Sequence, residues 1–152
     1  MSRAERAKEY FNQGYACSQA VALAFADLTT LSEDEIKRAT LGFGGGFGRM
    51  RLVCGAVSGM TMIVGLIFAK DENTSQNKLD TYQIVRELSE EFCKQTGSLV
   101  CSELLEMAKV IRTEGVVPQP RNTEYYKKRP CGELVYLAAN ILENYLNQKG
   151  II

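Results

Sequence analysis

The chain has 152 residues, 45% of them hydrophobic, which is enough to bury one core without disulfide support. Its 18 basic residues balance its 18 acidic residues, which argues against nucleic acid or an acidic membrane surface as a partner. Because it contains no histidine, Ser–His pairs, Cys–His pairs and all histidine-containing metal sites are excluded. We expect one domain over residues 1–152.

Three helices are predicted in the first 41 residues. Residues 2–12 carry an apolar stripe at helical spacing. Residues 17–28 are apolar on nearly all sides, so this second helix should be largely buried. The third helix, residues 33–41, begins with a capping box formed by Ser32 and Glu35.

The most apolar segment is residues 52–69, which follows a glycine-rich loop at residues 42–48. The segment carries no charge, but it reaches only the lower limit of a membrane span and contains several glycines and small polar residues. We therefore predict a buried central helix over about residues 53–69 and no membrane insertion.

The glycine loop shares only its composition with phosphate-binding loops. No GxGxxG register fits residues 42–51, no Lys-Ser/Thr pair follows, and no strand precedes it, so we do not expect a nucleotide. The loop lets backbone pass close to a cofactor or another helix, and Arg49 and Arg51 place positive charge near Cys54. For both arginines, a solvent-exposed position is the alternative of equal weight.

Two further helices and an irregular segment follow. Residues 77–96 have the pattern of a long amphipathic helix, and residues 101–110 that of a shorter one. Residues 115–120 contain two prolines and a glycine, so they cannot be helical. We interpret the basic, tyrosine-containing residues 121–130 as a solvated loop rather than a nucleic-acid site.

A last helix is predicted from residue 131 to about residue 147. No alternating strand pattern competes with these helices anywhere in the chain. The predicted fold class is therefore all-α: a single-domain helical bundle of about six or seven helices around the central apolar helix.

Four of the five cysteines share one local context, in which a loop or glycine precedes the cysteine and a small residue and an apolar helical run follow it. The four are Cys17, Cys54, Cys101 and Cys131. This context places each sulfur near a helix N-terminus, where free N–H groups and the helix dipole stabilise a thiolate. We therefore expect low pKa values for these thiols. Cys93 lies inside a predicted helix and is interpreted as a packing residue.

The spacing of the four cysteines matches no CxxC redox motif, zinc ribbon or ferredoxin pattern. If the four helix starts converge, Cys₄ coordination suits zinc or an iron–sulfur cluster; if only two approach, a reversible disulfide is the simpler outcome. Because four convergent thiolates repel one another, metal or cluster ligation is slightly favoured. Gly55 and Gly59 share one helix face and permit a neighbouring backbone to approach closely.

The compartment is predicted from the first residues and from cysteine usage. Residues 1–10 are charged and contain no apolar signal region, which points to the cytoplasm. Five widely spaced cysteines suit a reducing compartment, where they serve as thiols, metal ligands or transient redox pairs.

Along the chain, Cys17 is followed by a glycine-rich loop that leads into Cys54-Gly55-Ala56-Val57-Ser58-Gly59, and then by Cys101 and Cys131. This order resembles the C_GCAxxG_C_C family of small bacterial and archaeal redox-active proteins. The resemblance implies that the four cysteines are the defining positions, that Gly55, Ala56 and Gly59 complete the central motif, and that the gene lies near transporter genes. Cys93 lies outside the motif.

A related arrangement occurs in split-Soret cytochromes, which carry an iron–sulfur centre. The present chain departs from those proteins because it has no CxxCH haem-attachment site and no histidine. We therefore do not expect haem.

Two functional hypotheses follow from these patterns. The first is a cytoplasmic redox-active, metal-binding or iron–sulfur protein whose four cysteines act as redox thiols or ligands, with an unidentified redox partner. The residues expected around the bound group are Gly55, Ala56, Gly59, Arg49 and Arg51. The alternative is a helical protein–protein interaction module, in the form of a homodimer for example, whose cysteines are core residues.

Overall fold

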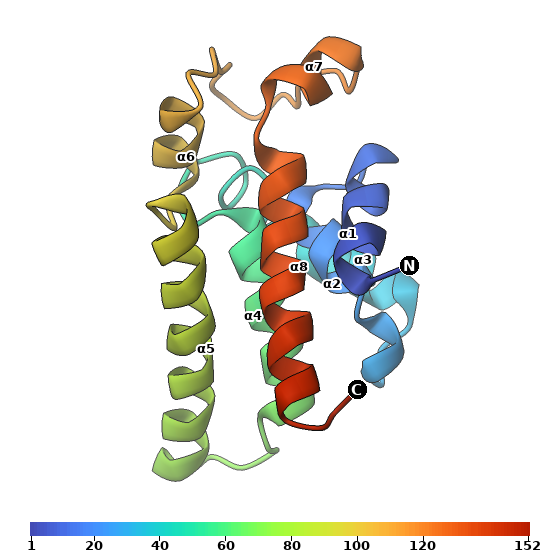
Figure 1. Cartoon of the computed structure of the whole chain (residues 1–152), viewed down its shortest axis with the longest axis vertical. Helices are drawn as coiled ribbons and strands as arrows, with labels where there is room; N and C mark the ends of the chain where they lie inside the picture. The colour runs from blue at the N-terminus through green and yellow to red at the C-terminus, as the bar shows by residue number, and fades with distance from the viewer.

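The computed structural model describes all 152 residues and is all-α, as predicted, with eight α-helices and one 3₁₀-helix (Figure 1). In chain order the elements are α1 (Arg3–Asn12), α2 (Cys17–Leu23), η1 (Ala26–Leu28), α3 (Glu33–Leu41), α4 (Gly55–Phe68), α5 (Ser75–Thr96), α6 (Cys101–Met107), α7 (Thr123–Lys128) and α8 (Cys131–Gln148). The only β pairing is an isolated antiparallel bridge between Val53 and Val100.

Helices α2, α4 and α8 pack pairwise against one another and form the middle of the molecule. Helix α1 covers α2 and α8, α3 covers α2 and α4, and α5 lies along α4 and α8 (Figure 1). The core side chains are contributed mainly by these helices and include Phe25, Met60, Ile63 and Leu142, all fully buried. None of the helices combines the length and the apolar character that crossing a bilayer requires.

The close approach predicted for two glycines is confirmed where α4 crosses α2. A Cβ atom on Gly59 would lie 2.5 Å from the carbonyl oxygen of Ser18, and one on Gly55 would lie 2.3 Å from the Sγ atom of Cys17. No side chain fits at such separations, so α4 meets the backbone of α2 at Gly59 and the side chain of Cys17 at Gly55. The Ser18 hydroxyl donates to the Thr40 carbonyl at 2.7 Å and so also ties α2 to α3.

The predicted helix over residues 17–28 is interrupted. Helix α2 ends at Leu23, and the chain resumes as the 3₁₀-helix η1. The Arg3 guanidinium donates to the Ala24 carbonyl at 2.8 Å and lies 5.4 Å from the centre of the Phe25 ring. A continuous α-helix would need that carbonyl for its own hydrogen bond, so the contact with α1 accompanies the break.

The interpretation of residues 121–130 as a solvated loop is wrong, because they contain α7. The Asn122 side chain caps this helix by accepting from the Tyr125 N–H at 2.9 Å. The rings of Tyr125 and Tyr126 lie 6.5 and 5.7 Å from the ring of Phe11 in α1. A helix of six residues is not stable alone, so α7 depends on its cap and on this aromatic contact.

The crossing of α2 and α4 gives a stability prediction. Gly59→Ala should lower the free energy of unfolding by about 2 kcal/mol or more, because the added methyl group meets the Ser18 backbone and cannot be accommodated by a rotamer change. Urea unfolding followed by circular dichroism measures the effect.

Gly65→Ala in the same helix is the matched control, because nothing lies within 4 Å of the added Cβ. It should raise the free energy of unfolding by about 0.5–1 kcal/mol through helix propensity. Equal effects of the two substitutions would contradict the described crossing.

Candidate functional site

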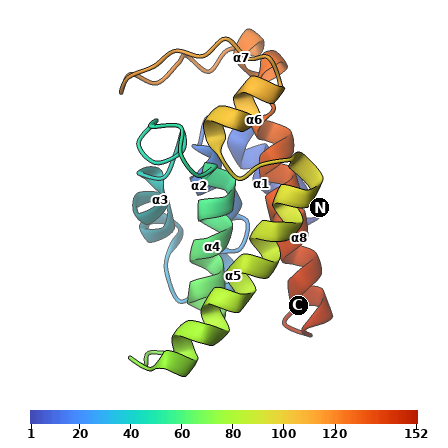
Figure 2. The ribbon, with the colours of Figure 1, turned by 90° about the vertical axis from the view of Figure 1, so that its left-hand side faces the viewer.

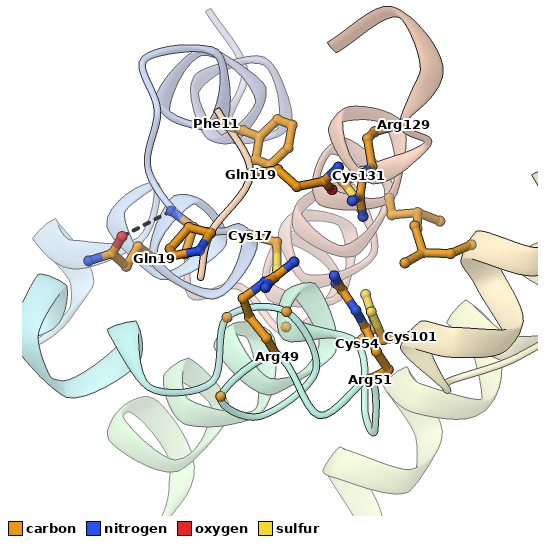
Figure 3. Close-up of a pocket in the computed structure, with 18 of the residues that line it drawn as sticks. Phe11, Cys17, Gln19, Arg49, Arg51, Cys54, Cys101, Gln119, Arg129 and Cys131 are labelled. Atoms are coloured by element: carbon orange, nitrogen blue, oxygen red, sulfur yellow. Dashed lines mark hydrogen bonds between the residues drawn. The ribbon is translucent and has the colours of Figure 1, made fainter. Parts of the chain in front are cut away.

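The four cysteines with a shared sequence context line one cavity of about 590 Å³ (Figure 3). Three of them are the first residues of helices: Cys17 in α2, Cys101 in α6 and Cys131 in α8. Cys54 is the N-cap of α4. The predicted placement at helix starts is therefore confirmed, and these four helix starts meet at the same cavity.

The short antiparallel bridge between Val53 and Val100 brings two of the cysteines together. The Cys54 N–H donates to the Leu99 carbonyl at 2.8 Å, and the Cys101 N–H donates to the Leu52 carbonyl at 2.5 Å. This pairing makes Cys54 and Cys101 diagonal neighbours on one face, with Cα atoms about 7–8 Å apart in such ladders. Figure 3 shows both sulfur atoms in the same part of the cavity.

Cys17 lies within electrostatic range of the other three thiols. Its sulfur lies against Gly55, the residue that follows Cys54. Burial raises the pKa of Cys54, Cys101 and Cys131, and a charge on Cys17 would raise each of these pKa values further. The start of α2 therefore belongs to the same thiol cluster as the starts of α4, α6 and α8.

The low pKa values expected from the helix starts are contradicted at Cys54, Cys101 and Cys131. Burial raises the pKa of Cys54 well above that of an ordinary thiol and raises the pKa of Cys131 to about 12. Removing a thiolate from water costs more than the partial charge at a helix end returns. At neutral pH these two thiols are therefore protonated.

Four arginines line the same cavity, and no aspartate or glutamate does. They are Arg49, Arg51, Arg121 and Arg129. Burial raises the pKa of Cys101, and the neighbouring guanidinium groups of Arg51 and Arg129 oppose this effect. Burial likewise dominates at Cys131, where Arg129 and Arg121 act in the opposite direction.

The glycine loop holds its two arginines in left-handed backbone conformations, with a φ of 62° at both Arg49 and Arg51. Such conformations cost about 1–3 kcal/mol each in residues other than glycine. A Cβ atom on Gly46 would lie 2.7 Å from the Cβ of Cys101, so the loop packs directly on the start of α6. The strained loop thereby places both arginines beside the thiols (Figure 3).

Arg49 and Arg51 also form hydrogen bonds with the irregular segment at residues 113–117, which crosses above the glycine loop (Figure 2). The Arg49 guanidinium donates to the carbonyls of Thr113 at 3.1 Å, of Gly115 at 2.6 Å and of Val117. The Arg51 guanidinium donates to the Thr113 carbonyl at 3.1 Å. The alternative of a solvent-exposed position is wrong for Arg51, which is only 6% exposed.

Arg121 and Arg129 were assigned to a solvated loop by the sequence interpretation, and this placement is wrong. The Arg121 guanidinium lies 4.7 Å from the ring centres of both Phe11 and Tyr125, and that of Arg129 lies 5.0 Å from the Tyr125 ring. Arg121, Tyr125 and Arg129 are spaced four residues apart, which is a helix-face pattern, and Asn122 supplies a cap. This signal was present in the sequence.

The remaining residues expected at the site divide into two groups. Gly55 lines the cavity together with Arg49 and Arg51. Ala56 is fully buried in the core, and Gly59 faces the backbone of α2, so neither lines the cavity. Cys93 lies in α5, away from the cavity lining.

The thiols were also compared with the requirements of a metal centre. Four cysteines are the donor set that zinc and iron–sulfur clusters use. In this structure no three Cys, Asp or Glu side chains lie close enough together to hold a metal ion. The cysteines thus fit such a group in chemical type, whereas their spacing does not form a closed site.

Comparison with known proteins identifies one family model, described as "Putative redox-active protein (C_GCAxxG_C_C)", which matches residues 15–145. No curated protein and no solved structure matches the chain. The matched residues include all four cavity cysteines and all four cavity arginines.

The raised thiol pKa values predict slow alkylation. At pH 8 a thiol with a pKa of about 12 is ionised to only about one part in 10⁴. Cys131 in the reduced, folded protein should therefore react with iodoacetamide at least about 100-fold more slowly than free N-acetylcysteine, with a rate that rises about tenfold per pH unit up to pH 10. Mass spectrometry of the alkylated peptides gives the rate for each cysteine.

The control for this measurement is the same protein in urea, where burial is lost and Cys131 should react as an ordinary thiol. A Cys131 rate in the folded protein that levels off below pH 9 would contradict the described burial.

Proposed function

Because this chain belongs to the C_GCAxxG_C_C family, we propose that its clustered cysteines form a redox-active thiol centre that exchanges electrons with an external disulfide. The observation that supports the proposal is the convergence of four thiols from four helix starts on one cavity lined by four guanidinium groups. Thiol–disulfide exchange requires neighbouring thiols and a cationic environment that favours the attacking thiolate.

Cys101 is the attacking thiol in this proposal. It is partly exposed, and the guanidinium groups of Arg51 and Arg129 offset part of the rise that burial causes in its pKa. Its thiolate attacks one sulfur of the external disulfide, which forms a mixed disulfide and releases one thiol.

Cys17 resolves the mixed disulfide because it is partly exposed in the same cavity, whereas burial keeps Cys54 and Cys131 protonated. Its thiolate attacks the Cys101 sulfur, forms a Cys17–Cys101 disulfide and releases the second external thiol. Two protein thiols are oxidised, the external disulfide is reduced by two electrons, and the two protons end on the released thiols.

Cys54 does not meet the external disulfide, because it is only 6% exposed. Because the Cys17 sulfur lies against Gly55, the Cys54 thiolate attacks Cys17 in the Cys17–Cys101 disulfide, which forms Cys17–Cys54 and frees the Cys101 thiol. Cys101 then attacks a second external disulfide, and the Cys131 thiolate attacks the resulting mixed disulfide, forms Cys101–Cys131 and releases the second external thiol. Four thiols consequently store two disulfide equivalents.

The second candidate function is a zinc or iron–sulfur centre on the same four cysteines. It is favoured by the cationic lining, since four thiolates carry negative charge that guanidinium groups offset. When bound, iron–sulfur would supply one-electron transfer and zinc a structural link. Iron, zinc and acid-labile sulfide analysis of protein purified without oxygen tests it: stoichiometric iron with sulfide supports a cluster, zinc alone supports a structural site, and absence of all three supports the thiol centre.

Removal of the resolving thiol tests the thiol proposal. With bis(2-hydroxyethyl) disulfide, the reduced wild-type protein should form a Cys17–Cys101 disulfide, because Cys17 releases the bound half of the reagent. Cys17→Ala should instead accumulate a mixed disulfide on Cys101, seen by mass spectrometry as one bound mercaptoethanol per chain.

Cys93→Ala is the matched control, because Cys93 lies outside the cavity. It should behave as the wild type. Failure of the wild-type protein to react, or a Cys17→Ala variant that still closes an internal disulfide through Cys101 at the wild-type rate, would contradict the assignment.

A further inference from the structure

The cavity holds more positive charge than its own residues balance. The chain has a formal net charge of zero, yet four guanidinium groups and no carboxylate line this one cavity. The ion pairs of the protein are formed by other basic residues, namely Arg3, Lys8, Arg86, Arg112 and Lys128. Arg49 and Arg51 donate to backbone carbonyls of residues 113–117, whereas the guanidinium groups of Arg121 and Arg129 form neither an ion pair nor a hydrogen bond and can pair with a negatively charged ligand.

Several polar atoms of the cavity lining are buried without a hydrogen-bond partner. They are the Nε atom of Arg51, the Nη1 atom of Arg121 and the Oε1 atom of Gln119. Arg51 and Arg129 are 6% and 9% exposed, so water does not fully solvate their charges. A buried donor without a partner is costly, and a carboxylate on a ligand would satisfy the two arginine nitrogens, whereas the Gln119 oxygen needs a donor.

Two of the four cavity thiols supply no negative charge. Burial holds the pKa of Cys54 well above its usual range and that of Cys131 at about 12, so both are neutral at physiological pH. Neither of them is therefore a counter-ion for the guanidinium groups.

The size and walls of the cavity indicate an organic ligand. A volume of about 590 Å³ lies in the range of small-molecule sites. Apolar side chains such as Phe11, Leu104 and Leu134 form part of the wall. This combination suits a molecule with an apolar body and anionic ends better than a small inorganic oxyanion.

From these observations we propose that the cavity recognises a small organic disulfide that carries carboxylate groups. The inference rests on the proposed thiol exchange and names its substrate class. The carboxylates pair with the guanidinium groups of Arg121 and Arg129, where bidentate hydrogen bonds are available. The disulfide then lies against Cys101, which forms the new S–S bond as one substrate thiol departs.

Three disulfides of different charge test the inference. They are 3,3′-dithiodipropionate, which carries two carboxylates, the neutral bis(2-hydroxyethyl) disulfide, and cystamine, which carries two ammonium groups. The rate of oxidation of the reduced protein by each is divided by the rate of the same disulfide with dithiothreitol. The normalised rate for the dicarboxylate should exceed that for the neutral disulfide by about tenfold or more, because hydrogen bonds to charged groups are worth that factor, and the rate for cystamine should be the lowest.

Arg121→Gln should reduce the ratio of the dicarboxylate rate to the neutral rate by about tenfold. The ratio is used because a general loss of reactivity or stability leaves it unchanged. Arg86→Gln is the matched control, since Arg86 lies on α5 and pairs only with Glu90 at 3.8 Å. It should retain the wild-type ratio.

The outcomes separate this inference from the proposed function. If none of the three disulfides oxidises the protein, the thiol-exchange function itself fails. If all three react at equal normalised rates, or if Arg121→Gln leaves the ratio unchanged, the thiol centre stands and the anionic substrate class is overturned.

Discussion

The contact on which the site depends is the close crossing of α2 and α4 at two glycines of α4. Gly55 and Gly59 of α4 lie against Cys17 and Ser18 of α2, and neither position has room for a Cβ atom. This contact sets the distance between the starts of the two helices and therefore places the Cys17 sulfur next to Cys54. A wider crossing would move the Cys17 sulfur away from Gly55 and the start of α4.

Electrostatics at the site reflects a competition between burial and positive charge. Burial favours the neutral thiols and raises their pKa values, whereas the guanidinium groups favour thiolates. Burial dominates at Cys131, and the two arginines beside Cys101 offset part of its effect.

Much of the fold and part of the site could be predicted from the sequence, because they depend on local signals. The Ser32 capping box predicted the start of α3, and the context of the cysteines predicted four helix starts. Two of the glycines in the CGAxxG element were correctly predicted to permit a close helix contact.

The remaining features depend on contacts between distant parts of the chain. One bridge between Val53 and Val100 brings Cys54 and Cys101 near each other. A bridge this short leaves no alternating pattern of apolar and polar residues in the sequence. Helix α7 has a cap and a helical spacing in the sequence, but it is too short to be stable without packing against Phe11 of α1, and its basic composition suggested a loop. The thiol pKa values depend on burial, which a helix-start argument does not include.

Binding of a trivalent arsenical to the reduced protein tests the clustering of the thiols in solution most directly. An aryl arsenoxide condenses with two neighbouring thiols, releasing water and forming two As–S bonds. The described cluster predicts that the folded protein binds phenylarsine oxide stoichiometrically through cavity cysteines, that Cys17→Ala weakens the binding, and that Cys93→Ala does not. Binding that requires unfolding, or that involves Cys93, would contradict the convergence of the four helix starts.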